Sequence, residues 1–160
     1  MSLRLVPAIH RATHRVGLYL ADLPEPGLSQ GEAHILAHLA TAGSASVGDL
    51  HRVLAHKRST LTSILDRLSE RALVVRSVGE RDRRTFIVTL TPAGRRVARR
   101  VYRHLESLER AVADRLSAGE LDAFGRVLAA VEEEARRRTG VSPRNGTSRG
   151  STGPARRRAR

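Results

Sequence analysis

Residues 57–94 read KRSTLTSILDRLSERALVVRSVGERDRRTFIVTLTPAG, and this stretch decides the fold. Its first part, residues 57–72, has apolar residues at three- and four-residue spacing, which predicts an amphipathic helix. The opposite face carries small polar side chains, and such a slim face suits a helix that enters the major groove of DNA, which is about 12 Å wide. We therefore interpret this segment as a recognition helix. The alternative is an ordinary amphipathic helix whose polar face meets only solvent.

The second part of this stretch predicts a β-hairpin with an arginine-rich tip. Residues 74–78 and 86–90 are rich in β-branched side chains, and residues 79–84, Gly-Glu-Arg-Asp-Arg-Arg, separate them. Guanidinium groups at an exposed tip suit the minor groove of A·T-rich DNA, where negative potential is concentrated. We expect Asp82 to pair with the Arg84 guanidinium and to fix its direction. The alternative is a charged tip that is simply solvated.

The runs STLTSILDRLSERALVVR and DRRTFIVTLTPAGRR resemble the MarR family of bacterial transcriptional regulators, whose wing carries D-R-R followed by L-T-x-x-G. Here these motifs are residues 82–84 and 90–94, and the order of elements agrees from about residue 3 to residue 138. Two positions depart from the family pattern: Ala72 stands where a glycine usually ends the helix, and Lys57 stands where a capping serine is common. Because alanine resists the left-handed conformation, we expect the exit from this helix to differ locally.

The resemblance implies a fold that is mainly α with a small β-wing (α+β), a winged helix-turn-helix domain with N- and C-terminal dimerisation helices. It implies a homodimer that binds a pseudo-palindromic operator, usually represses, and releases DNA when a small molecule enters a cleft between the dimerisation helices and the DNA-binding lobe. Residues 1–139 would form the regulator domain. Within it, residues 29–91 would be the DNA-binding lobe, and residues 1–28 and 92–138 the dimerisation helices.

Capping patterns predict where the other helices begin. A first helix is expected over residues 3–21, and later helices are marked by Ser29 with Glu32, Ser46 with Asp49, Thr91 with Pro92, and Ser117 with Glu120. The apolar stripes of the first and the last two helices predict a dimer interface, because no other apolar element is left to cover them. Alternatively, these helices fold back on their own domain.

The positive charge is concentrated at the C-terminal end. Residues 135–160 carry nine arginines and no acidic residue, so they supply +9 of the net charge of +13, and residues 1–134 supply +4. Residues 140–160 are rich in Ser, Gly, Pro and Arg and are expected to be a disordered tail. Such a tail attracts phosphates without regard to sequence, and the attraction weakens with salt.

Composition excludes several other classes of protein. The chain has no cysteine, hence no disulfide or thiol sensor, and it has neither an apolar run of membrane-spanning length nor a signal peptide, so a cytoplasmic protein is expected. No nucleophile–base motif is present, so no enzyme activity and no cofactor are predicted. His10 with His14, and His34 with His38, have the i,i+4 spacing of metal ligands, but solvated imidazoles explain them better, and no metal site is predicted.

The predicted partners are double-stranded DNA, a second copy of the chain and an unidentified small-molecule effector, with no membrane partner. Arg58 is the best candidate for a guanine contact, because hydroxyl groups read bases ambiguously. Two alternatives remain open: a non-specific architectural DNA-binding protein driven by the basic tail, and a metal-responsive regulator. The residues predicted to contact DNA are Arg58, Ser59, Thr62, Ser63, Arg81, Asp82, Arg83 and Arg84.

Overall fold

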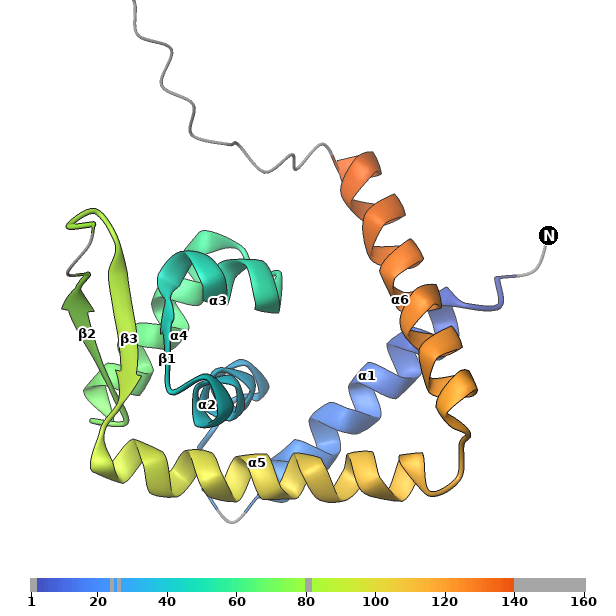
Figure 1. The fold of residues 1–160 in the computed structure, drawn as a ribbon, viewed down its shortest axis with the longest axis horizontal. Coiled ribbons are helices and arrows are strands. Elements are labelled where there is room, and N and C mark those ends of the chain that lie inside the picture. Colours follow the sequence, from blue (N-terminus) through green and yellow to red (C-terminus); the bar gives the residue numbers. More distant parts are fainter. Residues whose placement is uncertain (1–2, 24, 26, 80–81, 140–160) are drawn as a thin grey trace, which may run out of the picture. The chain divides into compact units, whose positions relative to one another are not determined.

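A computed structural model describes residues 3–23, 25, 27–79 and 82–139 (Figure 1). The chain divides into two compact units, Met1–Asp114 and Arg115–Arg160. The predicted tail, residues 140–160, and Arg81 lie outside the described residues. The first unit contains α1 (Val6–Ala21), α2 (Gln30–Ala42), β1 (Ser44–Ser46), α3 (Val47–Leu54), α4 (Arg58–Glu70), β2 (Val74–Val78), β3 (Phe86–Leu90) and α5 (Pro92–Ala113); the second contains α6 (Ala118–Thr139). The predicted fold class, mainly α with a small β-wing, is confirmed.

The predicted helix starts are confirmed by hydrogen bonds at their caps. Ser29 and Glu32 form a complete capping box at the start of α2, because each side chain satisfies the other residue's backbone N–H. The Ser46 hydroxyl accepts from the Asp49 N–H, and the Thr91 hydroxyl accepts from the Gly94 N–H. In the second unit, Ser117 and Glu120 exchange the same pair of bonds before α6.

The strands form one antiparallel sheet in the order β1-β3-β2 (Figure 1). The predicted hairpin is confirmed, with Val74 opposite Leu90 and Val78 opposite Phe86. The short strand β1 was not predicted, because three residues, Ser-Ala-Ser, are too few to show the two-residue alternation of a strand. It pairs with β3 through Ala45 opposite Val88, and this pairing closes the other edge of β3.

The core of the first unit lies where α2, α4, α5 and the sheet meet. The apolar faces predicted for α2 and α4 are buried, and together with Val88 of β3 and Val101 of α5 they make one cluster. Burying such side chains contributes about 1.5–3 kcal/mol each, which makes this cluster the main source of stability. Its fully buried aliphatic side chains are Ile35, Leu36, Leu39, Leu50, Leu61, Leu65, Leu68, Val74, Val88 and Val101.

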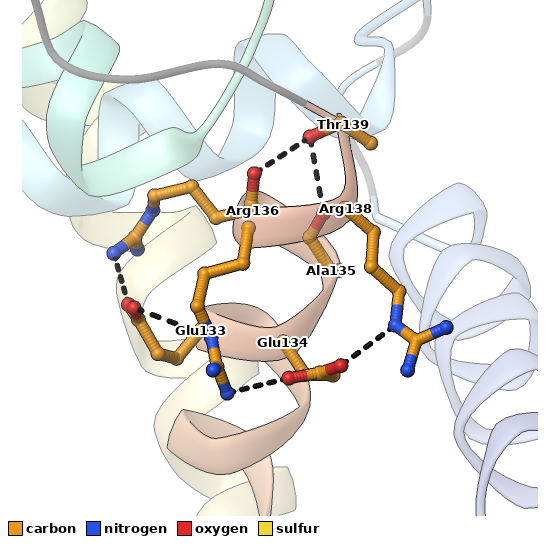
Figure 2. A network of polar contacts seen from close by, with 7 residues as sticks. Glu133, Glu134, Ala135, Arg136, Arg138 and Thr139 are labelled. Carbon is orange, nitrogen blue, oxygen red and sulfur yellow. Dashed lines mark hydrogen bonds and ion pairs between the residues drawn. The ribbon is translucent and has the colours of Figure 1, made fainter.

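The described part of the second unit contains a single exposed helix with ion pairs along it. None of the residues of α6, all of which the structure describes, is buried. In its last turns Arg136 pairs with Glu133 at 2.8 Å, and Arg138 pairs with Glu134 at 2.6 Å (Figure 2). Arg137 also pairs with Glu134. Three of the nine arginines assigned to the C-terminal segment therefore belong to a helix that balances part of their charge, and these cations also favour the negative end of the helix dipole.

No helix within the described ranges is both long enough and apolar enough to cross a membrane.

Candidate nucleic-acid interface

The N-terminal half of α4 presents the predicted base-reading residues to solvent. Arg58, Ser59, Thr62 and Ser63 are all exposed, whereas the intervening Leu61 is buried. The Thr62 hydroxyl donates a hydrogen bond to the Arg58 carbonyl at 3.0 Å, which leaves its methyl group and a lone pair for an outside partner. The sequence periodicity thus predicted correctly that these four side chains lie on the exposed face of the helix.

Lys57 occupies the N-cap of α4 and adopts the extended conformation of a cap, but no described side chain caps the helix. The first N–H groups of a helix have no partner within the helix, so here they are open to an outside acceptor. A helix N-terminus with free N–H groups attracts anions such as phosphate. A serine at this N-cap would bind one of these N–H groups, whereas Lys57 leaves them free and adds a positive charge to the same helix end.

A buried carboxylate connects the start of α2 to α4. Glu32 is 2% exposed and accepts hydrogen bonds from the Ser29 N–H at 2.7 Å and from the Ser29 hydroxyl at 2.6 Å. Nε of Arg67, on α4, donates to the other oxygen at 3.4 Å. Burial acts to raise the pKa of Glu32, but the Ser29 hydrogen bonds and the Arg67 charge outweigh it, and its pKa is lowered. The sequence showed Glu32 only as a capping residue, and the link to Arg67 depends on tertiary packing.

The exit from α4 keeps the conformation that the missing glycine would favour. Ala72 has a φ of 53°, in the left-handed region, so the expected local difference is wrong as far as the backbone is concerned. The Leu73 N–H donates to the Leu68 carbonyl and the Ala72 N–H to the Ser69 carbonyl, which is the hydrogen-bond pattern of a Schellman motif. Alanine bears the steric cost of this conformation, which is about 1–2 kcal/mol.

The L-T-x-x-G motif joins α5 to this exit. The Thr91 hydroxyl donates to the Ala72 carbonyl at 2.7 Å, and the Thr91 N–H donates to the Leu73 carbonyl at 3.1 Å. A Cβ on Gly94 would lie 1.8 Å from the Leu73 carbonyl oxygen, so only glycine fits there. The motif therefore lets the first turn of α5 contact the backbone between the recognition helix and the wing.

The tip of the wing is shaped by Asp82, in a different way from the one expected. Its Oδ1 accepts from the backbone N–H of Arg84 at 2.9 Å, and its Oδ2 accepts from the Thr85 hydroxyl at 3.1 Å. The carboxylate thus holds the main chain of the turn, and no ion pair joins Arg83 or Arg84 to a described carboxylate. Both arginines are exposed, and Arg81 lies outside the described residues.

The two histidine pairs with metal-ligand spacing lie on α1 and α2, outside the recognition helix and the wing. His10 and His14 are exposed on α1, whereas His34 and His38 are partly buried in α2, so the expectation that this second pair is solvated is wrong in degree. Burial, and then the electrostatic effect of the nearby His56, lower the pKa of His34. Within the ranges that the structure describes, no three metal-ligating side chains of the His, Cys, Asp or Glu type come together.

A shallow cationic depression lies along α5. Its volume is about 460 Å³. Beside it, the rings of Tyr19 and His104 are stacked with centroids 3.9 Å apart, the Tyr19 hydroxyl donates to the His104 carbonyl, and Nε2 of His104 donates to the Tyr19 carbonyl. These reciprocal contacts join α1 to α5. The residues that line the depression are Leu23, Arg100, Arg103, His104 and Ser107.

Comparison with known proteins shows a likeness to the MarR family over part of the chain. The MarR family model matches residues 28–86, which run from the end of the loop before α2 into β3. The transcriptional activatory protein BadR of Rhodopseudomonas palustris is 40% identical over 62 residues, which is 39% of this chain and 35% of BadR. The chain spans less than half the length of the curated relatives it matches.

Solved structures match over most of their length. BpsR of Bordetella bronchiseptica is 25% identical, with a TM-score of 0.67 over 82% of this chain and 95% of that protein. MepR of S. aureus, crystallised with DNA, has a TM-score of 0.70 over 84% of this chain and 99% of MepR, at 17% identity, and so supports the fold alone. The winged helix-turn-helix and the D-R-R and L-T-x-x-G motifs agree with this likeness to the MarR family, whose model covers residues 28–86 of the chain.

Proposed function

We propose that this protein is a sequence-specific DNA-binding transcriptional regulator that binds a pseudo-palindromic operator as a homodimer. The observation that carries the proposal is the fixed pairing of two cationic elements. The polar N-terminal face of α4 carries Arg58, the wing carries Arg83 and Arg84, and the ion pair between Asp66 and Arg76 joins the two elements. A helix that reads base edges together with a guanidinium-bearing wing covers a major groove and the adjacent minor groove. MepR, which shares the fold, was crystallised with DNA.

The proposed homodimer rests on apolar side chains that are exposed in the described part of the chain. At the start of α1, Val6 and the preceding Leu3 and Leu5 are each more than half exposed, and on α6 Phe124 is 56% exposed. Large apolar side chains exposed on a helix in this way are typical of a protein–protein interface. We propose that a second copy covers it, and light scattering on the purified chain should give twice the mass of 17.5 kDa.

Selection of binding sites from random DNA duplexes tests the proposed function directly. Purified protein should enrich a pseudo-palindrome, because a two-fold dimer presents its recognition helices to half-sites about 34–36 Å apart. The enriched duplex should then compete against a scrambled duplex of the same composition. A protein that enriches no motif would remove sequence-specific regulation from the proposal.

We also propose that a small anionic molecule binds in the depression beside Tyr19 and His104 and releases the DNA. Of the two guanidinium groups that line this surface, Arg100 pairs with Glu25, so Arg103, beside the His104 imidazole, is the cation left to bind a carboxylate or phosphate. DNA binding by BpsR, a structural relative, is regulated by 6-hydroxynicotinic acid, and this supports a small acid as the effector class. A panel of small carboxylates should release the selected duplex from the wild type, and Arg103→Gln should lose the response.

A non-specific architectural role is the second candidate, and the C-terminal arginines favour it. Three of the nine are ion-paired in α6, which leaves six arginines in residues 140–160. Truncation after Thr139 should therefore lower affinity for random DNA and flatten its salt dependence while site discrimination is kept. If truncation abolished discrimination between operator and random DNA, the tail would carry the function instead.

The direction of regulation is also a proposal. We propose repression, whereas the relative BadR is a transcriptional activatory protein. A reporter gene placed behind the selected operator decides between repression and activation.

A further inference from the structure

Two apolar side chains are exposed near the tip of the wing. Val78 ends β2 and Phe86 begins β3; they are paired across the hairpin, and each is 52% exposed. They lie immediately before and after the turn that carries Arg83 and Arg84. Phe86 is one of only two phenylalanines in the chain.

The register places this pair on the face of the hairpin that packs against the recognition helix. Side chains alternate along a strand, so Val78 shares its face with Arg76 and Val74. Val74 is buried in the core, and Arg76 pairs with Asp66 of α4. Val78 and Phe86 continue this face toward the tip. They therefore lie on the same side of the hairpin as α4.

We infer that Val78 and Phe86 pack against the deoxyribose walls of the DNA minor groove, beside the guanidinium groups of the tip. This inference rests on the proposed DNA-binding function. Sugars are the apolar part of the DNA backbone, and apolar side chains of minor-groove proteins pack there or wedge between base steps. The arginines supply charge, and the apolar pair supplies contact area that salt does not screen.

Duplex DNA fits this surface better than a protein partner. The pair is continuous with the exposed cationic turn, and Arg83 and Arg84 form no ion pair with a described carboxylate. It is also continuous, through Arg76 and Asp66, with the recognition helix that carries Arg58. An acidic, sugar-lined groove complements both features at once.

The hairpin offers a matched control for the test. Val75 lies on the same strand as Val78 and is 51% exposed, but the alternation places it on the opposite face. Val78→Thr and Val75→Thr make the same nearly isosteric change at equal exposure, and threonine keeps the strand preference of valine. Phe86→Thr extends the test to the other strand, and thermal unfolding followed by circular dichroism verifies that each variant is folded.

Operator affinity and sugar protection are then measured on the selected duplex. We expect Val78→Thr and Phe86→Thr to weaken binding by about fivefold to tenfold, where tenfold corresponds to about 1.4 kcal/mol. The slope of log affinity against log salt should stay as in the wild type, because no phosphate contact is lost, whereas Arg84→Ala should reduce it by about 1. Hydroxyl-radical footprints should show protected sugars at the outer flanks with wild type and Val75→Thr, and loss of that protection with Phe86→Thr.

Three outcomes would overturn the inference. Equal affinities and footprints for Val78→Thr, Phe86→Thr and Val75→Thr would show that the pair does not touch DNA, while the proposed function would stand on the wild-type selection. A change in oligomeric mass with Val78→Thr or Phe86→Thr would assign the pair to an interface between copies. A wild-type protein that binds no duplex would remove the proposed function and this inference together.

Discussion

Arg76 of β2 donates a hydrogen bond from Nη2 to Oδ1 of Asp66 in α4 at 2.5 Å. Its Nε is buried and has no hydrogen-bond partner among the described residues, so the carboxylate is the main compensation for burying this guanidinium. The sequence places Asp66 on the polar face of α4, where solvent would be its expected neighbour. In the folded protein this residue instead connects the wing to the recognition helix.

Removing this carboxylate should loosen the wing. Asp66→Ala leaves a partly buried guanidinium unpaired, and we expect a loss of about 1 kcal/mol in the free energy of unfolding, together with weaker operator binding. Arg110→Ala breaks the exposed pair with Glu106 and is the control, for which about 0.5 kcal/mol or less is expected. Urea unfolding of both variants measures the difference. Equal losses would mean that the wing is positioned by the sheet alone.

Arg58 is expected to read a base. Arg58→Ala should relax the preference at one symmetric pair of operator positions and cost about 1–3 kcal/mol per half-site, because a guanidinium can bind guanine through two hydrogen bonds. Ser59→Ala is the matched change at the next position and should cost less, uniformly across sequences, as a phosphate contact would. The measurement is a site-selection profile for each variant. A uniform loss with Arg58→Ala would identify Arg58 as a backbone anchor and leave specificity to Thr62, Ser63 and DNA shape.

The wing tip should depend on Arg84 for charge and on Asp82 for shape. Arg84→Ala should weaken operator binding by about 1–3 kcal/mol with the fold intact. Asp82→Ala should also weaken it, because the Arg84 N–H and the Thr85 hydroxyl lose their acceptor and the turn loosens. Operator titrations at two salt concentrations separate the two effects, since only Arg84→Ala removes a positive charge. Wild-type affinity in folded Arg84→Ala protein would remove the wing from the mechanism.

The junction between α4 and α5 predicts opposite effects for two small substitutions. Ala72→Gly relieves a left-handed alanine and should stabilise the protein by about 0.5–1 kcal/mol. Gly94→Ala places a Cβ against the Leu73 carbonyl and should destabilise it by about 3 kcal/mol or more. Gly125→Ala in α6, where a Cβ would meet nothing within 4 Å, is the control and should be neutral or stabilising. Thermal unfolding orders the three; a tolerated Gly94→Ala would show that the junction can shift.

His34 predicts loss of stability in mild acid. The pKa of His34 is lowered by burial and by the nearby His56. Because the unfolded chain, with a pKa of about 6.5, then binds a proton more readily, stability is full above about pH 6.5 and falls as pH drops toward the folded pKa. His34→Gln should flatten this decline between pH 7.5 and 5.5, and His38→Gln, one turn along the same helix, is the control. The same slope in His34→Gln and wild type would assign the decline to other groups.

Signals that act over a few residues were readable from the sequence alone. The period of Leu61, Ile64, Leu65 and Leu68 determined the buried face of α4, and the Ser29–Glu32 and Ser117–Glu120 patterns determined where α2 and α6 begin, because these interactions span three or four residues. The two strands of the wing followed from β-branched runs on either side of a polar turn. The prediction that Arg58 and Arg84 would be exposed is confirmed by the structure for the same local reason.

Tertiary structure decided the contacts between residues that are distant in sequence. Strand β1 exists because Ala45 meets Val88, and three residues have no strand pattern of their own. Glu32 and Asp66 looked like capping and solvent-facing carboxylates, but packing brought guanidinium groups of α4 and β2 to them. The exposure of Val78 and Phe86 likewise depends on where α4 stops covering the sheet, since a strand pattern shows which residues share a face but not how far a neighbouring helix extends along it.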